Sequence, residues 1–107
     1  MSLRPPGSLS SSRPASASEG AFDALGYEIM AEKAAALGRV GDNAARAMAR
    51  LHECDRESPE RSALLKAAAQ AVHAWFIQRE ICGMRRHHDV IRELAIPREV
   101  LIRLGAS

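Results

Sequence analysis

Apolar residues recur every three or four positions along most of the chain, which is the spacing of an α-helix with a buried face. A second apolar stripe runs beside the first one between Tyr27 and Met48. Two stripes on one helix predict two packing neighbours, because a single neighbour covers one face. The first stripe consists of Phe22, Leu25, Ile29, Ala36, Val40, Ala44, Ala47, Leu51 and Cys54.

The two stripes predict one long helix that begins near Ser18 or Gly20 and ends near Asp55. The apolar spacing continues across Gly41 and Asp42, and Asp42 forms an i,i+4 pair with Arg46. The alternative is a break at Gly41-Asp42, since glycine weakens a helix and Asp42 can cap a new one.

Ser58-Pro59-Glu60 predicts the start of a second helix, with serine as the N-cap and proline in the first turn. This helix is expected from Pro59 to about Cys82, antiparallel to the first because the connection is short. Only His73 is polar between residues 71 and 77, so we expect burial on all sides there, with Trp75 and Phe76 at the centre of the core.

Gly83 is suited to end the second helix, and residues 84–94 predict a short third helix. Pro97 predicts the start of a fourth helix that ends at Gly105. The fold class is therefore all-α: a long antiparallel helical hairpin with two short C-terminal helices. Their expected inward residues are Val90, Ile91, Leu94, Val100, Leu101 and Leu104.

Residues 1–18 predict a disordered tail, because three prolines and almost no large apolar side chains leave the entropy of ordering uncompensated. Residues 19–107 predict a single helical domain. No apolar run approaches the roughly 20 residues of a membrane span. The two cysteines, Cys54 and Cys82, lack a CxxC spacing, which predicts reduced thiols and a cytoplasmic protein.

Charge is distributed unevenly along the chain, although the formal net charge is only +2. Residues 19–60 hold nine acidic and five basic residues, a balance of −4, whereas residues 61–107 hold eight basic and four acidic ones, a balance of +4. Opposite halves can pair within one chain or between copies, so the basic total alone is weak evidence for nucleic-acid binding.

Two stretches of the sequence, ALGYEIMAEKAAALGR and FIQREICGMRRHHDVIRELAIPREVLIRLG, resemble a small bacterial family of short helical proteins. This family is one of those described only as domains of unknown function. The resemblance covers residues 22–107 and implies an uncharacterised bacterial, cytoplasmic protein. It brings no activity, ligand or site.

The residues that suggest chemistry do not form a catalytic or metal-binding pattern. Cys82, His87, His88 and Asp89 lack the spacing of zinc or di-iron ligands, and Cys82 near a helix C-terminus is a poor nucleophile for His87 to activate. We therefore expect no catalytic residue, metal or cofactor, and no enzyme. Gln78, Arg79, Glu80 and His88 predict a structural polar cluster; a small-ligand or enzymatic pocket near Arg79 and Glu80 is an alternative.

Residues 86–105 are similar to a DNA-binding helix-turn-helix, which is a further alternative function. Two departures weaken the similarity: Ala95 stands where the turn usually has glycine, and Ile91 stands where a small residue is expected. Glu99 would also repel phosphate. The DNA contacts of this alternative would be Arg85, Arg86, Arg98 and Arg103.

The second stripe of the long helix exceeds what one partner helix of about 24 residues can cover, so we expect self-association. The predicted product is a homodimer with a helical-bundle core. The predicted function is that of a non-enzymatic interaction or scaffold protein with an unidentified protein partner. The expected self-association face is Tyr27, Met30, Ala34, Leu37, Gly41 and Met48.

Overall fold

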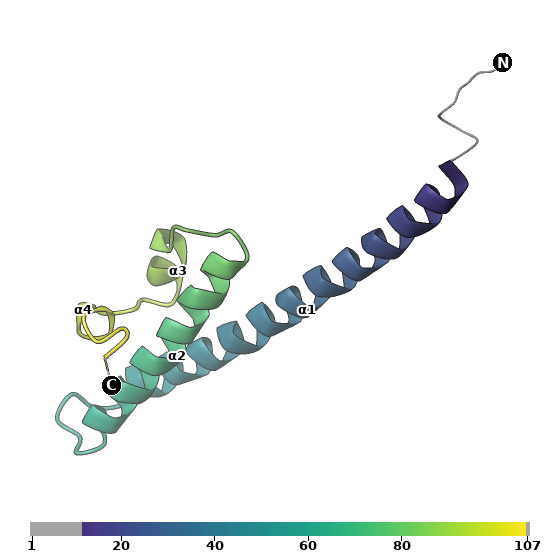
Figure 1. Cartoon of the computed structure of the whole chain (residues 1–107). Coiled ribbons are helices and arrows are strands. Elements are labelled where there is room, and N and C mark those ends of the chain that lie inside the picture. Colours follow the sequence, from purple (N-terminus) through teal and green to yellow (C-terminus); the bar gives the residue numbers. More distant parts are fainter. Residues whose placement is uncertain (1–11, 107) are drawn as a thin grey trace. The chain divides into compact units, whose positions relative to one another are not determined.

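The computed structural model describes residues 12–106, with side chains from residue 20 onward. The described residues form helices and no strand, which confirms the all-α prediction. The chain divides between Glu32 and Lys33 into two compact units, so α1 contributes to both. The helices are α1 (Ser12–Glu53), α2 (Arg61–Ile81), α3 (His88–Glu93) and α4 (Arg98–Leu101) (Figure 1).

Helix α1 begins at Ser12, six residues before the predicted start at Ser18. Pro14 lies in its first turn, where backbone N–H groups have no partner within the helix, so the missing N–H of proline removes no hydrogen bond. Of the predicted disordered tail, residues 1–11 lie outside the described residues, and α1 includes residues 12–18.

Helix α1 continues without a break through Gly41 and Asp42, as the apolar spacing predicts. The glycine is explained by a close neighbour on α2. A Cβ atom at position 41 would lie 3.1 Å from Nε1 of Trp75, closer than side chains normally approach. Gly41 is therefore the place where the Trp75 indole packs against the backbone of α1.

The sequence predicted Ser58 as the N-cap of the second helix, but the N-cap of α2 is Glu60, and Ser58 forms a tight turn before the helix starts. The Ser58 hydroxyl accepts a hydrogen bond from the Glu60 N–H at 3.2 Å, and the Ser58 carbonyl accepts one from the Arg61 N–H at 3.1 Å. Helix α2 then begins at Arg61, two residues after the predicted start at Pro59.

Helices α2 and α3 end in the same capping motif. After α2, the Met84 N–H donates to the Arg79 carbonyl at 2.9 Å, and Gly83 has a φ of +94°. After α3, the Ile96 N–H donates to the Ile91 carbonyl at 2.9 Å. Here the left-handed residue is Ala95, with a φ of +50°, a conformation that favours glycine.

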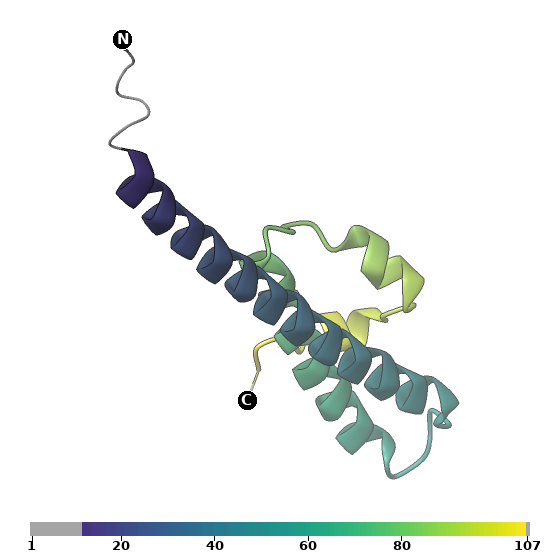
Figure 2. The same ribbon diagram turned by 90° about the vertical axis from the view of Figure 1, so that its right-hand side faces the viewer.

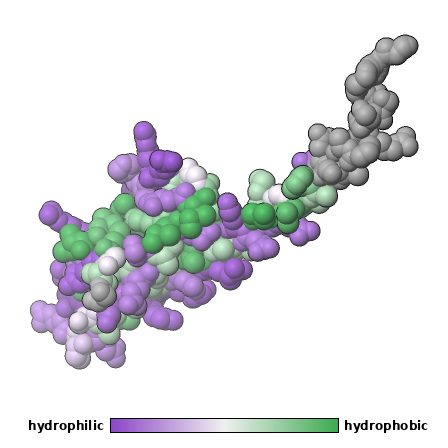
Figure 3. Space-filling view, in the orientation of Figure 1, coloured by the Kyte–Doolittle hydropathy of each residue, from purple (hydrophilic) through white to green (hydrophobic). Residues whose placement is uncertain are grey.

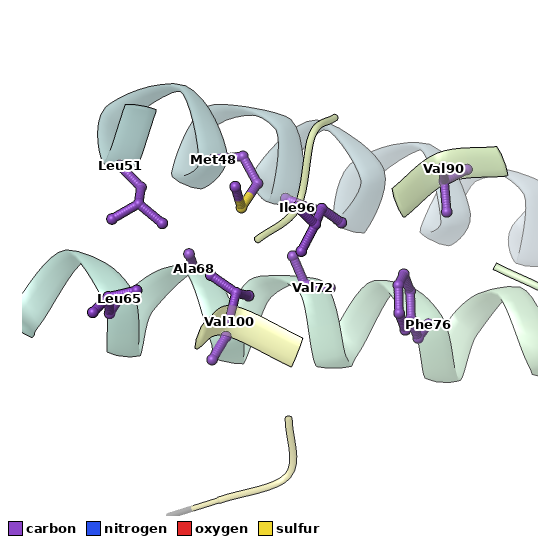
Figure 4. Packing of buried hydrophobic residues seen from close by; sticks show 11 residues of the cluster. Met48, Leu51, Leu65, Ala68, Val72, Phe76, Val90, Ile96 and Val100 are labelled. Carbon is purple, nitrogen blue, oxygen red and sulfur yellow. The ribbon is translucent and has the colours of Figure 1, made fainter. Parts of the chain in front are cut away.

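The core of the second unit is formed by all four helices and the α3–α4 connection. Helix α2 lies alongside the part of α1 that follows Lys33, and α4 packs on α2 (Figures 1 and 2). Side chains of α1 and α2 face one another, and Val100 enters from α4 (Figure 4). The buried residues are Ala44, Met48, Leu51, Leu65, Ala68, Ala69, Val72, Phe76, Val90, Ile96 and Val100.

Helices α3 and α4 are docked, because Val90 and Val100 are buried. Helix α3 has six residues and begins at His88, whereas the sequence predicted a helix from residue 84. Residues 84–87 are held outside a helix, because the Arg79 guanidinium binds His87 and the Arg86 carbonyl. A side chain of α2 therefore delays the start of α3.

The prediction that residues 71–77 are buried on all sides is wrong. Val72 and Phe76 are buried, but Ala74 is exposed and Ile77 is 44% exposed. Trp75 is half-buried, so it lies at the edge of the core and not at its centre. This part of α2 therefore carries apolar side chains on its exposed face as well as on its buried face.

Candidate functional site

The most exposed large apolar side chains of the first unit lie on α1, in residues 20–32, which we call the α1 segment. Five large apolar side chains in residues 22–30 of this segment are 46–76% exposed. Hydrophobic surface is visible on the part of α1 that follows the grey residues in Figure 3. These side chains are Phe22, Leu25, Tyr27, Ile29 and Met30.

The predicted self-association face is only partly exposed. Tyr27 and Met30 are 76% and 68% exposed, and Ala34 is exposed. Leu37 is half-buried. Met48 is 1% exposed, since it lies in the core between α1 and α2, and its assignment to an exposed face is wrong.

Gly41 is likewise occupied within the chain, because Trp75 packs on it. The neighbours within the chain therefore cover both stripes of α1 near Gly41 and Met48. The uncovered apolar surface lies instead in residues 22–30, where both stripes are exposed. Phe22, Leu25 and Ile29 share a helical phase with the buried Leu51, since 22, 25, 29 and 51 fall on one face at 100° per residue.

Gly26 lies on the same face of the α1 segment as Phe22 and Ile29, at i+4 and i−3. A Cβ atom at position 26 would meet nothing within 4 Å. Glycine in a helix interior costs about 1 kcal/mol relative to alanine, and no contact of the described chain requires it here. The apolar face thus contains a point at which another backbone can approach closely.

The polar cluster near the end of α2 is centred on His87, not on the predicted His88. The His87 ring stacks on Phe76, with centroids 4.1 Å apart and planes 7° apart. Arg79 Nε donates to His87 Nδ1 at 3.0 Å, and His87 Nε2 lies 3.0 Å from a carboxylate oxygen of Glu80. The Arg79 guanidinium also lies over the Trp75 ring, 5.7 Å from its centroid.

These bonds fix the roles of the two imidazole nitrogens. Because Nδ1 of His87 accepts the Arg79 N–H, the ring proton is on Nε2, which donates to Glu80. His87 is thus a neutral link between a cation and a carboxylate that are adjacent in sequence. The cluster ties residue 87 to α2, which is a structural role.

The other predicted members of this cluster do not join it in the same way. His88 is exposed as the first residue of α3, and Gln78 is half-buried. Sequence reasoning missed His87 because it assumed that both histidines lie on one helix. The informative signal was Gly83, which follows α2 and precedes a short non-helical connection to α3.

A second polar link joins α2 to α4. Arg61 and Glu99 form a hydrogen-bonded ion pair whose side chains are 14% and 30% exposed. His52 on α1 lies beside it and donates from Nε2 to the Leu94 carbonyl at 3.1 Å. The ion pair directs the Glu99 carboxylate toward Arg61 on α2, and the Glu99 side chain is only 30% exposed.

Four cavities on the described part of the chain lie around the start of α2 and around α4, away from Arg79 and Glu80. One cavity of about 290 Å³ is lined by His52, Cys54 and Arg61. The guanidinium of Arg61 is already paired with Glu99. Another, of about 490 Å³, lies between the start of α2 and Arg103. None of these four is lined by Arg79 or Glu80, so they do not support the predicted pocket there.

The four arginines of the DNA-binding alternative are exposed, but they do not line one helix. Arg85 and Arg86 precede α3, and Arg98 begins α4. Arg103 follows α4 and donates to the Glu99 carbonyl at 2.7 Å. Helix α4 has four residues and its Val100 is buried, so it offers about one turn to a groove. DNA binding stays a prediction.

Chemistry-bearing residues are scattered over the described part of the chain. Among residues 12–106, no three His, Cys, Asp or Glu side chains lie together as a metal would require. Cys54 and Cys82 are free thiols, both half-buried. Within the same residues, no helix combines the length and the hydrophobicity that crossing a bilayer requires.

Comparison with known proteins places the chain in a family but brings no activity. The model of a family of unknown function, DUF6665, matches residues 1–107, so the chain belongs to this family. The match includes the first 21 residues, which the resemblance seen in the sequence had left out. No curated protein and no solved structure matches the chain.

Proposed function

We propose that this member of the DUF6665 family is a small non-enzymatic interaction protein that self-associates through the α1 segment. The observation that carries the proposal is the exposure of five large apolar side chains within residues 22–30. Contiguous apolar surface of this kind marks interaction sites in water-soluble folds, because leaving it in water forgoes roughly 25 cal/mol for each Å² that could be buried.

The proposal places the protein in the bacterial cytoplasm as a homodimer. The two cysteines support a reducing compartment, since neither is paired with the other. Gly26 supports a helix as the partner element, because it allows close approach on the face that carries Phe22 and Ile29.

Light scattering coupled to size exclusion tests the proposal on the full chain. At tens of micromolar we expect the mass of a dimer, and substitution of the exposed face by Phe22→Gln, Tyr27→Gln and Met30→Gln is expected to yield a monomer. Glutamine keeps helix propensity close to that of the original residues, so the variant tests the surface and not the helix.

The matched control is Ala24→Gln with Ala31→Gln, which lie about 160° and 180° around the helix from Phe22 and outside the arc that holds the five large apolar side chains. This control is expected to remain dimeric. A wild-type chain that is monomeric throughout the concentration range, or a triple Phe22/Tyr27/Met30 variant that still dimerises, would overturn the proposal.

A further inference from the structure

The outward face of α2 is a second uncovered apolar surface. Six of its nine exposed residues follow a helical spacing of four and three along the whole helix, and the other three, Ser62, Lys66 and Glu80, lie beside them. Five of the six are apolar and none is charged, although the face is open to solvent. We call this face the α2 stripe; it consists of Ala63, Ala67, Gln70, Ala74, Ile77 and Ile81.

The α2 stripe continues into the exposed residues that follow α2. Ile77 and Ile81 are 44% and 53% exposed, and Met84 is 36% exposed. Alanines at the start of the stripe leave room for a helix to approach, and the isoleucines at its end supply most of the apolar area. This combination of small and large apolar side chains is suited to contact with the apolar face of an amphipathic helix.

Charge distinguishes the two uncovered surfaces. The α1 segment has three acidic residues, Asp23, Glu28 and Glu32, and no basic one. The α2 stripe is flanked by exposed Lys66 and followed by Arg85 and Arg86. Glu80, whose carboxylate accepts a hydrogen bond from His87, also lies beside the stripe, so three basic side chains stand against one acidic one. The two surfaces are therefore complementary in both hydrophobicity and charge.

Each of the two surfaces is uncovered within its own unit, since Tyr27 of the α1 segment is 76% exposed and Ile81 of the α2 stripe is 53% exposed. Helix α1 packs on the inward face of α2, which carries Ala68 and Val72. The opposite face of α2, which carries the α2 stripe, stays exposed. A second copy of this chain offers the α1 segment both an apolar stripe and flanking basic side chains.

We propose that the α1 segment of each copy docks on the α2 stripe of the other, so that two identical contacts close a two-fold dimer. This inference rests on the proposed self-association and names its second half. A reciprocal exchange uses both uncovered surfaces on both copies, and it closes without leaving a free end that would extend into a fibre. Acidic side chains of one copy then lie near Lys66, Arg85 and Arg86 of the other.

Complementation between two full-length variants tests the exchange. One variant carries Phe22→Gln, Tyr27→Gln and Met30→Gln in the α1 segment, and the other carries Ile77→Gln and Ile81→Gln in the α2 stripe. For each variant alone, the Kd of the dimer is expected to rise by at least about tenfold, because both contacts are damaged in its homodimer.

An equimolar mixture of the two variants is expected to form a heterodimer. In that pair the intact α1 segment of one variant meets the intact α2 stripe of the other, so one of the two contacts is restored. Sedimentation of a fluorescently labelled variant, titrated with the unlabelled other, measures this. The labelled variant titrated with itself is the control, and circular dichroism confirms that both variants are folded.

The outcomes separate this inference from the proposed function. If the α1 variant is monomeric while the α2 variant dimerises like the wild type, self-association stands but the exchange is wrong, and α1 segments pair with one another. If both variants are monomeric and the mixture stays monomeric, the exchange is also wrong. If neither variant changes the Kd, the proposed function fails as well.

Charge reversal gives an independent check within a single chain. Glu28→Arg with Glu32→Arg is expected to weaken the dimer, and so is Arg85→Glu with Arg86→Glu. All four changes together are expected to recover most of the lost affinity, and the effect should fade as salt is raised. Recovery that fails at low salt would overturn the assigned pairing of the two surfaces.

Discussion

Replacement of His87 by alanine is expected to destabilise the fold by about 2 kcal/mol, whereas replacement of the adjacent His88 is expected to change stability by less than about 0.5 kcal/mol. His87 stacks on Phe76 at 4.1 Å and accepts a hydrogen bond from Arg79 at 3.0 Å. Its side chain is 12% exposed, whereas His88 is exposed. The pair is therefore a matched comparison of one residue type at neighbouring positions.

The magnitude follows from the two contacts. An aromatic stack contributes about 0.5–1.5 kcal/mol beyond burial, and a hydrogen bond to a charged group contributes about 1.5–3 kcal/mol. Arg79 is half-buried and can turn to water when His87 is removed, which reduces the second contribution. Helix capping adds nothing, because His87 precedes α3 without a capping hydrogen bond from its side chain.

Urea unfolding followed by circular dichroism measures both variants, and about 2 kcal/mol corresponds to roughly 10 °C in Tm for a domain of this size. A double-mutant cycle of His87→Ala with Arg79→Met is expected to give a coupling of about 1 kcal/mol. The corresponding cycle with Glu80→Gln is expected to give less than about 0.5 kcal/mol, because the Glu80 side chain is 55% exposed and glutamine still accepts the bond. Equal losses for His87→Ala and His88→Ala would refute the assignment of the cluster to His87.

Two further pairs of variants test the fold in the same assay. Met48→Ala is expected to cost about 3 kcal/mol through the cavity it leaves, whereas Met30→Ala, at a 68% exposed position, is expected to cost less than about 0.5 kcal/mol in the monomer; similar losses would contradict the burial of Met48. Ala95→Gly is expected to stabilise by about 0.5–1 kcal/mol because φ is +50° there, and Gly83→Ala to destabilise by about 1 kcal/mol at a φ of +94°; a loss of stability in Ala95→Gly would argue against the left-handed conformation of Ala95.

The helices themselves could be predicted from the sequence because their causes are local. The spacing of apolar residues predicted correctly that α1 continues through Gly41, and Gly83 predicted the end of α2. What the sequence could not supply was the partner of each side chain. Arg79 was expected to cluster with His88, but its guanidinium binds His87 and the Arg86 carbonyl instead. This contact shortens α3. A bond between residues eight positions apart leaves no trace in a helical pattern.

The uncovered apolar surfaces of α1 and α2 also depend on partners that the sequence pattern does not reveal. The sequence predicted that α1 has too much apolar surface around its circumference for one neighbour, and in the second unit that argument fails, because Met48 is buried and Gly41 is occupied by Trp75. The difference in length, which the sequence also predicted, accounts for the surplus that remains: α1 has 42 residues and α2 has 21, so α2 cannot cover every turn of α1. The apolar run of residues 71–77 had been assigned to the core because only His73 is polar there, yet Ala74 and Ile77 face outward. Periodicity thus predicts that a face will be covered, but not which molecule covers it. In this chain the two uncovered faces are an acidic segment and a stripe flanked by basic residues, and this difference in charge supports the proposed exchange of contacts between two copies.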